Sequence, residues 1–316
     1  TQHYRNFEIM DTLAPVAFFG YNRPSHTRRT LEALMQSRLS DKTSLYIFID
    51  GPKPNANSEA IENNKAVKNV VREKQWCKEI KIVEAPGNKG LFHSIVDGIN
   101  EVLKTNETVI VLEDDVQVFP GFLKYMNDAL GVYANEGRVM HISGFSKPQF
   151  ENVALKESTF FFNHTTCWGW ATWKRAWSKF NSDPLLLMKL ARQKGNLKKL
   201  NINGTFENYW SLHSIAHKKF QSWNTLWHTS VFLNNGLCLH PAKSLTANFG
   251  FDGSGTNCDV SGQVGNNEFF AEDLPVYPIP LENNEEIIKH NTYKIHSFRF
   301  RAIFYLKHKL RFLFRR

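Results

Sequence analysis

The sequence contains few cysteines, and they are far apart. No Cys-x-x-Cys pair occurs among the four, which are Cys77, Cys167, Cys238 and Cys258. Zinc sites and disulfide frameworks use clustered or regularly spaced cysteines. We therefore expect neither, and reduced thiols in a cytosolic protein are the simpler interpretation.

Long apolar runs, repeats and phosphate-binding signatures are also missing. No run is long enough to span a bilayer, and no internal repeat or low-complexity segment appears. The "GNKG" at residues 87–90 lacks the spacing of a P-loop or a dinucleotide fingerprint, so neither an ATPase nor a dehydrogenase is predicted. The 316 residues are 42% hydrophobic and 22% charged, enough for a sizeable core in one large domain or two intimate ones.

Positive charge gathers at one end of the chain. Of the net charge of +9, eight Lys and Arg lie between Tyr293 and Arg316, where no acid occurs, which leaves +1 for the other residues. On a helical wheel from Phe298, an apolar and a basic side separate imperfectly. The apolar side holds Ala302, Tyr305, Leu306, Leu310 and Leu313, and the basic side holds Arg301, Lys307, His308, Arg311 and Arg315. We expect this tail to lie on an anionic membrane at the cytoplasmic face, and a helix docked on the protein's own core is the alternative.

The first half alternates short apolar runs with amphipathic segments. Strands are predicted at 14–21, 44–50, 80–85 and 108–115. Helices are predicted at 25–37, 57–76 and 90–105, with Ser25 as the first N-cap. This alternation predicts an α/β fold with a mostly parallel sheet flanked by helices. Ligands of such sheets bind beyond the carboxyl ends of the strands, where polar and glycine residues collect in this sequence.

The second half is aromatic and less regular. A strand is predicted at 138–145, and a helix, a short strand and a Gly/Asn-rich loop at 222–258. Trp173 and Trp177, four apart on a predicted helix, are expected in the core. We divide the chain into a first half (1–150), a second half (151–286) and the basic tail (287–316).

Three consecutive carboxylates end the fourth predicted strand, within "VIVLEDDVQVFPGFL". Glu113 and Asp115 point one way and Asp114 the other. Carboxylates converging at a strand end suit Mg²⁺ or Mn²⁺, which keep open positions for phosphate oxygens. A solvated acidic turn is the alternative, and we favour the metal because unpaired buried acids are costly.

Polar residues at the other strand ends suit a nucleotide. Asp50 can accept from a base imide, and Arg23 can pair with phosphate or stack on a base. Lys89 and the backbone N–H groups of residues 87–90 form a plausible anion site before the third helix. A surface ion pair and a simple turn are the alternatives.

The stretch Trp168-Gly169-Trp170 is a candidate sugar platform. A glycine lets the backbone approach a ligand, and indole rings stack on sugar faces. A purely structural aromatic cluster is the alternative.

These pieces together resemble a known family. "VAFFGYNRPSHTRRTLEAL", "IFIDG", "VIVLEDDVQVFPGFLKYM", "FFFNHTTCWGW" and "SWNTLW" followed by "CLHP" cover most of the chain from Pro15 to about Cys258. Their order resembles GT-A (Rossmann-like) glycosyltransferases, in detail the N-acetylglucosaminyltransferase I type and related bacterial sugar transferases. The resemblance implies that Arg23 and Asp50 hold the base. It also implies that Glu113 and Asp114 face the ribose and donor sugar, that Asp115 binds the metal, and that residues 167–170 border the donor sugar. Lys89 and His93 are further candidate donor-binding residues. The resemblance also implies that residues 1–150 form a nucleotide-sugar-binding half and residues 151–286 an acceptor-binding half.

The position of the general base departs from the family. An inverting transferase needs a base for the acceptor hydroxyl, and the family's carboxylate in a Trp-Asp stretch corresponds to Asn224 here. An amide is no base. Four explanations stay open: an engineered Asp-to-Asn change, another carboxylate such as Asp252 or Glu207, a retaining mechanism, or lost activity.

The sequence thus predicts a metal-dependent enzyme using Mn²⁺ or Mg²⁺. It would move a sugar from a nucleotide donor, a UDP-sugar, to a glycan or lipid-linked acceptor in cell-surface polysaccharide synthesis, with inversion. A catalytically impaired sugar- or nucleotide-binding relative is the alternative. Nucleic-acid binding is disfavoured because basic residues are not interleaved with the Trp-rich centre.

Overall fold

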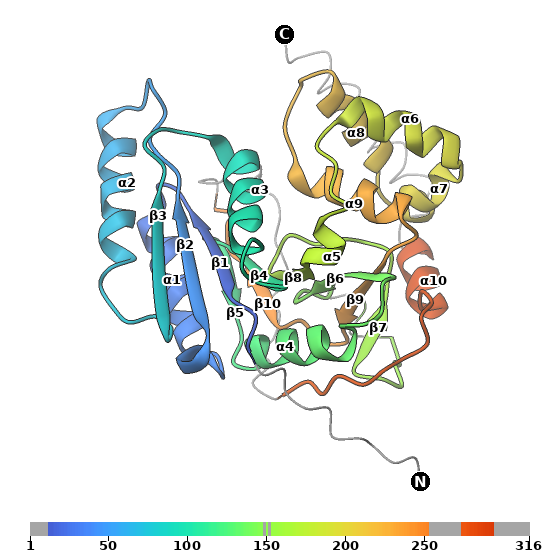
Figure 1. Ribbon diagram of the computed structural model, residues 1–316. Coiled ribbons are helices and arrows are strands. Elements are labelled where there is room, and N and C mark those ends of the chain that lie inside the picture. Colours follow the sequence, from blue (N-terminus) through green and yellow to red (C-terminus); the bar gives the residue numbers. More distant parts are fainter. Residues whose placement is uncertain (1–11, 148–149, 151–152, 253–272, 294–316) are drawn as a thin grey trace.

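The computed structural model shows an α/β fold built on one large sheet (Figure 1). It describes residues 12–147, 150, 153–252 and 273–293. The strands are β1 (Val16–Gly20), β2 (Ser44–Ile49), β3 (Glu79–Glu84), β4 (Thr108–Glu113), β5 (Val116–Val118), β6 (Val139–Ser143), β7 (Thr159–Phe161), β8 (Trp170–Trp173), β9 (Leu237–Pro241) and β10 (Thr246–Asn248). The helices are α1 (Pro24–Met35), α2 (Ser58–Val70), α3 (Gly90–Val102), α4 (Phe122–Val132), α5 (Lys174–Trp177), α6 (Pro184–Lys194), α7 (Leu197–Leu200), α8 (Asn208–Ala216), α9 (Trp223–Leu233) and α10 (Glu285–Tyr293), with 3₁₀ turns η1 (Ser40–Lys42) and η3 (Ile202–Gly204).

The sheet confirms the predicted α/β class. Its order is β3-β2-β1-β4-β8-β6-β9-β7. The first four strands are parallel, as their alternation with helices along the sequence predicts. On the other side, β8 runs antiparallel to both β4 and β6, and β7 runs antiparallel to β9. A separate antiparallel pair joins β5 to β10.

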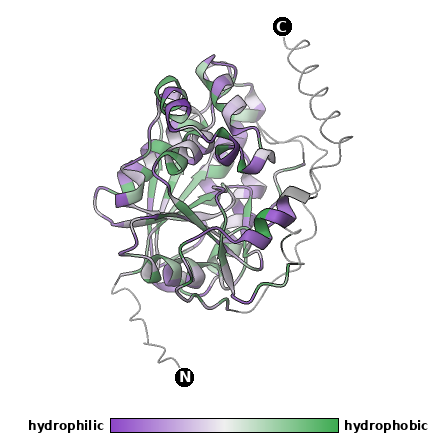
Figure 2. Ribbon diagram, turned by 90° about the vertical axis from the view of Figure 1, so that its right-hand side faces the viewer, coloured by the Kyte–Doolittle hydropathy of each residue, from purple (hydrophilic) through white to green (hydrophobic). Residues whose placement is uncertain are grey.

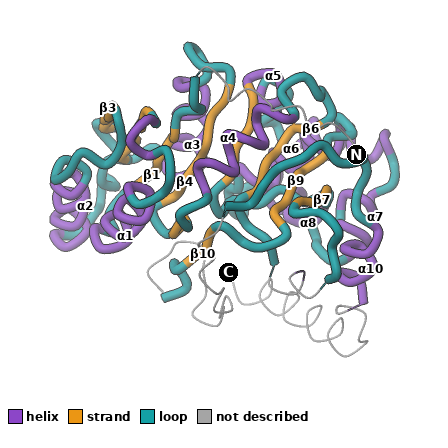
Figure 3. Tube along the Cα trace, turned by 90° about the horizontal axis from the view of Figure 1, so that it is seen from below, coloured by secondary structure: helices purple, strands orange, loops and turns teal. Residues whose placement is uncertain are grey.

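Helices cover the sheet and bury its apolar residues. In Figure 1, α5 and α9 lie above β6 and β9, and α4 lies below them. Seen from below, α4 crosses β4 and β6 (Figure 3). Hydrophobic residues concentrate in the central strands (Figure 2), where Val16, Ile110 and Trp170 have no exposed surface. This core fixes the positions of the strand ends.

Three local predictions are wrong. Ser25 is not an N-cap, because α1 begins at Pro24, whose fixed φ and missing N–H suit the first helical position. The helix predicted at 57–76 ends at Val70, and Trp76 is buried with its Nε1 donating to Val71 O. Trp173 is the last residue of β8 rather than helical, although it and Trp177 are buried as expected.

Two further predictions concern cysteines and the membrane. Cys77 and Cys238 are free thiols, and Cys258 lies outside the described residues. Within the part of the chain that the structure describes, no helix has the length and apolarity needed to cross a bilayer. The predicted amphipathic helix from Phe298 onward lies outside the described residues.

Candidate functional site

The parallel register brings the predicted polar strand ends to one edge of the sheet. β2, β1 and β4 are neighbours, with Gly20 beside Ile49 and Phe19 beside Glu113. The residues that follow these strands therefore meet at the same edge. Arg23, Asp50 and the acidic triplet come from this edge, as the sequence predicts.

Arg23 joins the end of β1 to the end of β4. It is the N-cap residue of α1, and its guanidinium contacts both oxygens of Asp114, with Nε 3.3 Å from Oδ2 and Nη2 bonded to Oδ1. Nη2 also lies 3.0 Å from Oδ2 of Asp115. A planar guanidinium can bridge two carboxylates in this way, whereas an ammonium lacks the matching fork. The buried acids thus have a counter-charge within the chain.

The ionisation of the triplet reflects its burial. Desolvation raises the pKa of Asp114 to about 6, even though Arg23 acts in the opposite direction. The pKa of Glu113 lies well above its ordinary value, mainly because of burial and then because of the neighbouring Asp115 and Asp114 charges. The carboxylates raise the pKa of Arg23 although burial lowers it. Arg23 therefore stays charged, and Glu113 and Asp114 hold protons more readily than exposed carboxyls do.

β10 and the loop after it, far along the chain, also contact Asp115. The β5–β10 pair places Asn248 so that its Nδ2 donates to Oδ1 of Asp115 at 3.2 Å. Oδ1 of Asn248 in turn accepts from the N–H of Gly250 at 2.9 Å. A Cβ at residue 250 would lie 2.4 Å from Oδ2 of Asp115, so only glycine lets the backbone come this close.

Asp50 holds the beginning of α3. Its Oδ1 accepts from the N–H groups of Gly51 and Lys89 at 2.9 and 2.8 Å. Its Oδ2 accepts from Nδ2 of Asn88 and the N–H of Gly90 at 3.0 and 2.9 Å. The anion site predicted at residues 87–90 is therefore filled by the chain's own carboxylate. Because four donors use its four lone-pair positions, Asp50 would have to release one of them to accept from a base.

Lys89 and His93 lie on the first turns of the same helix. The ammonium of Lys89 is exposed and lies 3.2 Å from Oδ2 of Asp97. His93 is also exposed, with its ring edge-on to Phe92. Both side chains are accessible to a ligand at this edge.

The predicted sugar platform is contradicted in part. Trp170 has no exposed surface, and its ring stacks on Trp223 and on His141, each with ring centroids 5.1 Å apart. The prediction that this ring stacks on a sugar is therefore wrong, because β8 is an interior strand of the sheet. Trp168 is partly exposed, edge-on to Phe145.

Gly169 is required by packing within the protein. It adopts a φ of +72°, and a Cβ there would lie 2.8 Å from Cγ2 of Thr246 and 3.1 Å from the Phe122 ring. The glycine therefore lets the backbone approach the side chains of Thr246 and Phe122, rather than a ligand. Its carbonyl accepts from the N–H of Gly144 at 2.8 Å.

The three candidate bases lie in different places. Asn224 is in the first turn of α9, and its Oδ1 accepts from Oγ1 of Thr165 at 3.0 Å. Oδ2 of Asp252 lies 3.2 Å from Nε2 of His26, the second residue after Pro24 in α1. Glu207 is the N-cap residue of α8, in the helical region of α6, α7 and α8 (Figure 1). Of the three, only Asp252 contacts α1, the helix whose N-cap residue is Arg23.

Sequence reasoning missed several neighbours of the acids, namely His26, Asn88, Asn248 and Gly250. The ring of His26 stacks on Phe249 at 5.0 Å, and its pKa is lowered by burial and by the Arg23 charge. The "TANFGFDG" stretch carries the only signal, because a loop rich in Asn and Gly often makes a close backbone approach.

The donor atoms at this edge fit a hard divalent cation that shares its ligands with a phosphate. Carboxylate oxygens of Asp115 are the type that Mg²⁺ and Mn²⁺ prefer. Nη1 of Arg23 is buried and has no hydrogen-bond partner among the described residues, which leaves N–H groups for an anionic oxygen. Among the described residues, no three His, Cys, Asp or Glu side chains form a metal cluster.

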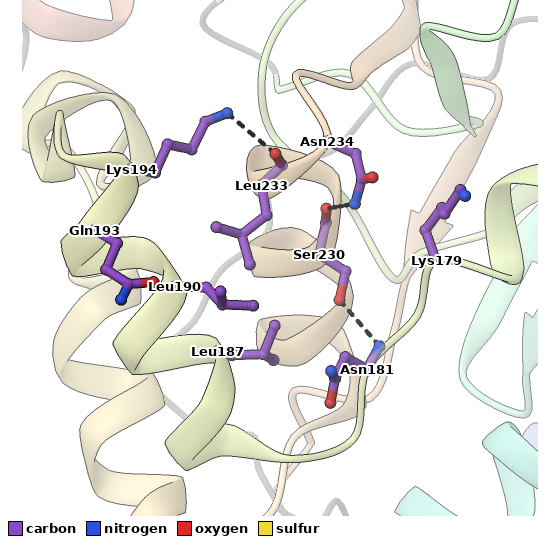
Figure 4. Close-up of a pocket in the computed structure, with 9 residues that line it drawn as sticks. All are labelled: Lys179, Asn181, Leu187, Leu190, Gln193, Lys194, Ser230, Leu233 and Asn234. Carbon is purple, nitrogen blue, oxygen red and sulfur yellow. Dashed lines mark hydrogen bonds between the residues drawn. The ribbon is translucent and has the colours of Figure 1, made fainter.

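A pocket elsewhere contains none of the predicted site residues. It has a volume of about 520 Å³ and lies between α6 and α9 (Figure 4). Its floor is apolar, with Leu187, Leu190 and Leu233, and Lys194 spans it to donate to Leu233 O at 3.0 Å. It is separate from the strand-end site.

The comparisons with known proteins identify no family. No protein-family model and no curated protein match the sequence. Similar solved structures include a UDP-glucose pyrophosphorylase in complex with UDP-glucose (13% identity, TM-score 0.33, covering 53% of this chain and 79% of that one). Others are S. aureus TarS (14%, 0.35, 72% and 35%) and the galactosyltransferase LgtC in complex with donor and acceptor sugar analogues (8%, 0.37, 71% and 72%). This chain thus spans about a third of TarS. Each of these TM-scores is below 0.5.

Proposed function

We propose that this chain is a metal-dependent GT-A glycosyltransferase. It transfers a sugar, with inversion, from a nucleotide donor, a UDP-sugar, to a glycan or lipid-linked acceptor in cell-surface polysaccharide synthesis. The observation that carries the proposal is the convergence of Arg23, Asp114 and Asp115 at the ends of adjacent parallel strands. Perturbed, buried charges at the ligand-binding edge of an α/β sheet are typical of a functional site.

The proposed roles follow from the chemistry of these side chains. Asp115, oriented by Asn248, would hold Mn²⁺ or Mg²⁺, which would stabilise charge on the departing nucleoside diphosphate. Arg23 would donate its unpartnered Nη1–H to a phosphate oxygen. Glu113 and Asp114 would face the ribose and donor sugar, with Trp168 at the sugar's border.

A membrane location belongs to the same proposal. The basic tail, of which residues 294–316 lie outside the described part of the chain, would hold the enzyme at the cytoplasmic, inner face of the membrane. That placement suits an acceptor carried on a lipid.

One observation favours a second candidate, a catalytically impaired sugar- or nucleotide-binding relative. Asn224 occupies the position expected for the base, and its amide oxygen accepts from Thr165. Such a protein would bind a nucleotide sugar without transferring it. Release of UDP from UDP-sugars in the presence of Mn²⁺ and an acceptor separates the two.

Calorimetric titration of UDP into the full chain, with and without Mn²⁺, tests the proposal. Wild type should bind UDP tightly only with the metal. Asp115→Ala should abolish the Mn²⁺-dependent part, because it removes the metal's carboxylate, while the fold survives since this side chain adds little apolar burial.

Asp41→Ala is the matched control, since Asp41 is an exposed carboxylate in η1. It should bind as wild type does. Undiminished Mn²⁺-dependent binding by Asp115→Ala would remove Asp115 from the metal site. Absence of any UDP binding by wild type would contradict the nucleotide-sugar function itself.

A further inference from the structure

Large apolar side chains are exposed on one helical region of the molecule. Of the nine exposed large hydrophobic residues in the described chain, five lie between residues 185 and 220. Leu185 is 63% exposed, Trp210 59% and Phe220 40%, and the other two are Leu186 and Leu190. Exposed apolar side chains gathered in one region mark an interaction site more often than isolated ones do.

The geometry of α6 and α8 places these side chains on the helix sides that face away from the protein's core. Leu187 and Met188 of α6 pack with Leu212 and Ile215 of α8 in one buried cluster that also includes Leu226 of α9. With 3.6 residues per turn, Leu186 and Trp210 then lie on the opposite sides of their helices. The two helices lie next to each other, because Arg192 of α6 donates to the hydroxyl of Tyr209 in α8. We call this outward surface the α6–α8 face, made of Leu185, Leu186, Lys189, Arg192, Trp210, Lys218, Lys219 and Phe220.

Positive charge surrounds the apolar residues of the α6–α8 face. Between Asp183 and Phe220 there are seven Lys and Arg against two acids, a net charge of +5. Residues 293–316 carry a further +8, so these two segments together carry +13. Because the whole chain carries +9, all other residues have a net charge of −4. Lys189, Arg192, Lys218 and Lys219 are all exposed. Purple and green alternate along the helices at the top of Figure 2, where α6 and α8 lie.

We propose that the α6–α8 face lies on an anionic phospholipid membrane, with Trp210, Leu185 and Phe220 in the acyl boundary and the lysines among the headgroups. Apolar anchors ringed by cations fit such a surface, and tryptophan prefers the interface between headgroups and acyl chains. A protein partner would be expected to meet fewer lysines, because lysine is depleted at protein interfaces. This inference uses described residues only and needs neither the tail nor the transferase activity.

Trp210 is a native reporter for this contact. The other seven tryptophans are buried or, for Trp168, partly buried. Residues 294–316 contain no tryptophan. Brominated lipids quench only indoles that reach the acyl region, so quenching reports on Trp210 and is silent about the tail.

The test is tryptophan fluorescence of the full chain with vesicles of brominated phosphatidylcholine and phosphatidylserine. We expect a blue shift and quenching at low salt, both weakened by high salt and by omission of phosphatidylserine. Trp210→Phe should remove the quenching while keeping most of the binding in a sedimentation assay. Leu185→Ser with Phe220→Ser should weaken sedimentation severalfold.

The matched control is Ile61→Ser with Leu91→Ser, which changes exposed apolar residues of α2 and α3 and should sediment as wild type does. Sedimentation without quenching of Trp210 would overturn the proposal and leave the tail as the membrane contact. Equal quenching with purely zwitterionic vesicles would overturn the anionic specificity. Absence of binding to any vesicle would overturn the proposal entirely.

Discussion

Arg23 determines the electrostatic state of the strand-end site. It is bonded to Asp114 and Asp115, and its Nη1 is buried without a hydrogen-bond partner in the described part of the chain. A lysine would supply the charge without the three-atom fork that spans both carboxylates. An incoming phosphate would therefore meet a guanidinium already held in place, which lowers the entropic cost of binding it.

Asn224 can be tested by restoring a carboxylate. Asn224→Asp keeps an acceptor oxygen for Thr165, so the local hydrogen bond and the fold should persist. If residue 224 faces the acceptor, transfer should rise by about 10²–10⁴-fold, the usual contribution of a general base, with little change in the Kd of UDP. Initial rates of UDP release measure the gain, and Asn224→Ala is the control. No gain together with robust wild-type activity would point to Asp252, Glu207 or a retaining route.

Gly250→Ala tests the close approach to Asp115. The added methyl would lie 2.4 Å from Oδ2, so either the carboxylate or the loop must shift. Mn²⁺-dependent UDP binding should weaken at least tenfold, equivalent to about 1.4 kcal/mol. Gly137→Ala, where a Cβ meets nothing within 4 Å, should bind normally. Wild-type affinity in Gly250→Ala would show that the carboxylate tolerates displacement.

The sequence predicted the place of a site residue only where that residue follows a recognisable strand. Arg23 and Asp115 directly follow strands, and parallel strands end at one edge, so their meeting could be predicted. Asn248 reaches Asp115 across 133 residues through a three-residue strand, for which periodicity gives no signal. Trp170 was misassigned because a Trp-Gly-Trp sequence does not distinguish an interior strand from a surface platform.

At the scale of elements, α3 is joined to the end of β2. Asp50 satisfies the N–H groups of Lys89 and Gly90 and carries a negative charge at the positive end of the helix dipole. The backbone of Gly87 lies against Gly51, where a Cβ would meet it at 2.6 Å. The loop before α3 thus has little freedom to move independently of β2.

Asp50→Asn should therefore destabilise the protein. The amide keeps one acceptor oxygen but presents an N–H₂ group to donors, so about 1–3 kcal/mol of unfolding free energy should be lost. Urea denaturation measures the change. Asp97→Asn, which alters an exposed ion pair of the same helix, should cost at most about 1 kcal/mol. Equal effects of the two variants would contradict a special role for Asp50.

Elements with a clear period were predicted, and the others were not. The alternation of β1 to β4 with α1 to α3 was correct in type and order. The insertion of β8 between β4 and β6 was not predicted, since its four residues lie within an aromatic segment that also suits a helix. Non-local pairing of short strands depends on the packed sheet rather than on local propensity.

At the scale of the whole molecule, a group of buried bases makes stability depend on pH. Burial lowers the pKa of His228 and His240 to about 4 and that of Lys147 to about 7. Lys147 lies over the Phe206 ring at 4.1 Å, and its Nζ is 3.4 Å from Oδ1 of Asn291 in α10. These groups are more easily deprotonated in the folded chain than in the unfolded one.

The direction in which stability changes with pH follows from the number of protons that the folded and unfolded chains bind. Between the folded pKa of Lys147, about 7, and its ordinary value of 10.5, the unfolded chain binds more protons, so stability rises with pH. Burial raises the pKa of Cys77 to about 12, which opposes the rise once ordinary thiols ionise. The unfolding free energy should therefore increase from pH 7 to about 8.5, by at most about 1.4 kcal/mol per pH unit. Urea denaturation should show that Lys147→Met flattens this rise, and an unchanged slope would contradict the assignment.

Asn248 is synthesised long after Asp115, which affects the order in which the strand-end site forms during translation. At about 5–20 residues per second, the ribosome adds the 133 residues between Asp115 and Asn248 in roughly 7 to 27 seconds. Arg23 is made before the acids and Asn248 long after them. The nascent N-terminal half therefore emerges with its acidic strand end already paired with a cation. The hydrogen bond from Asn248 to Asp115 forms only when β10 has been translated and pairs with β5.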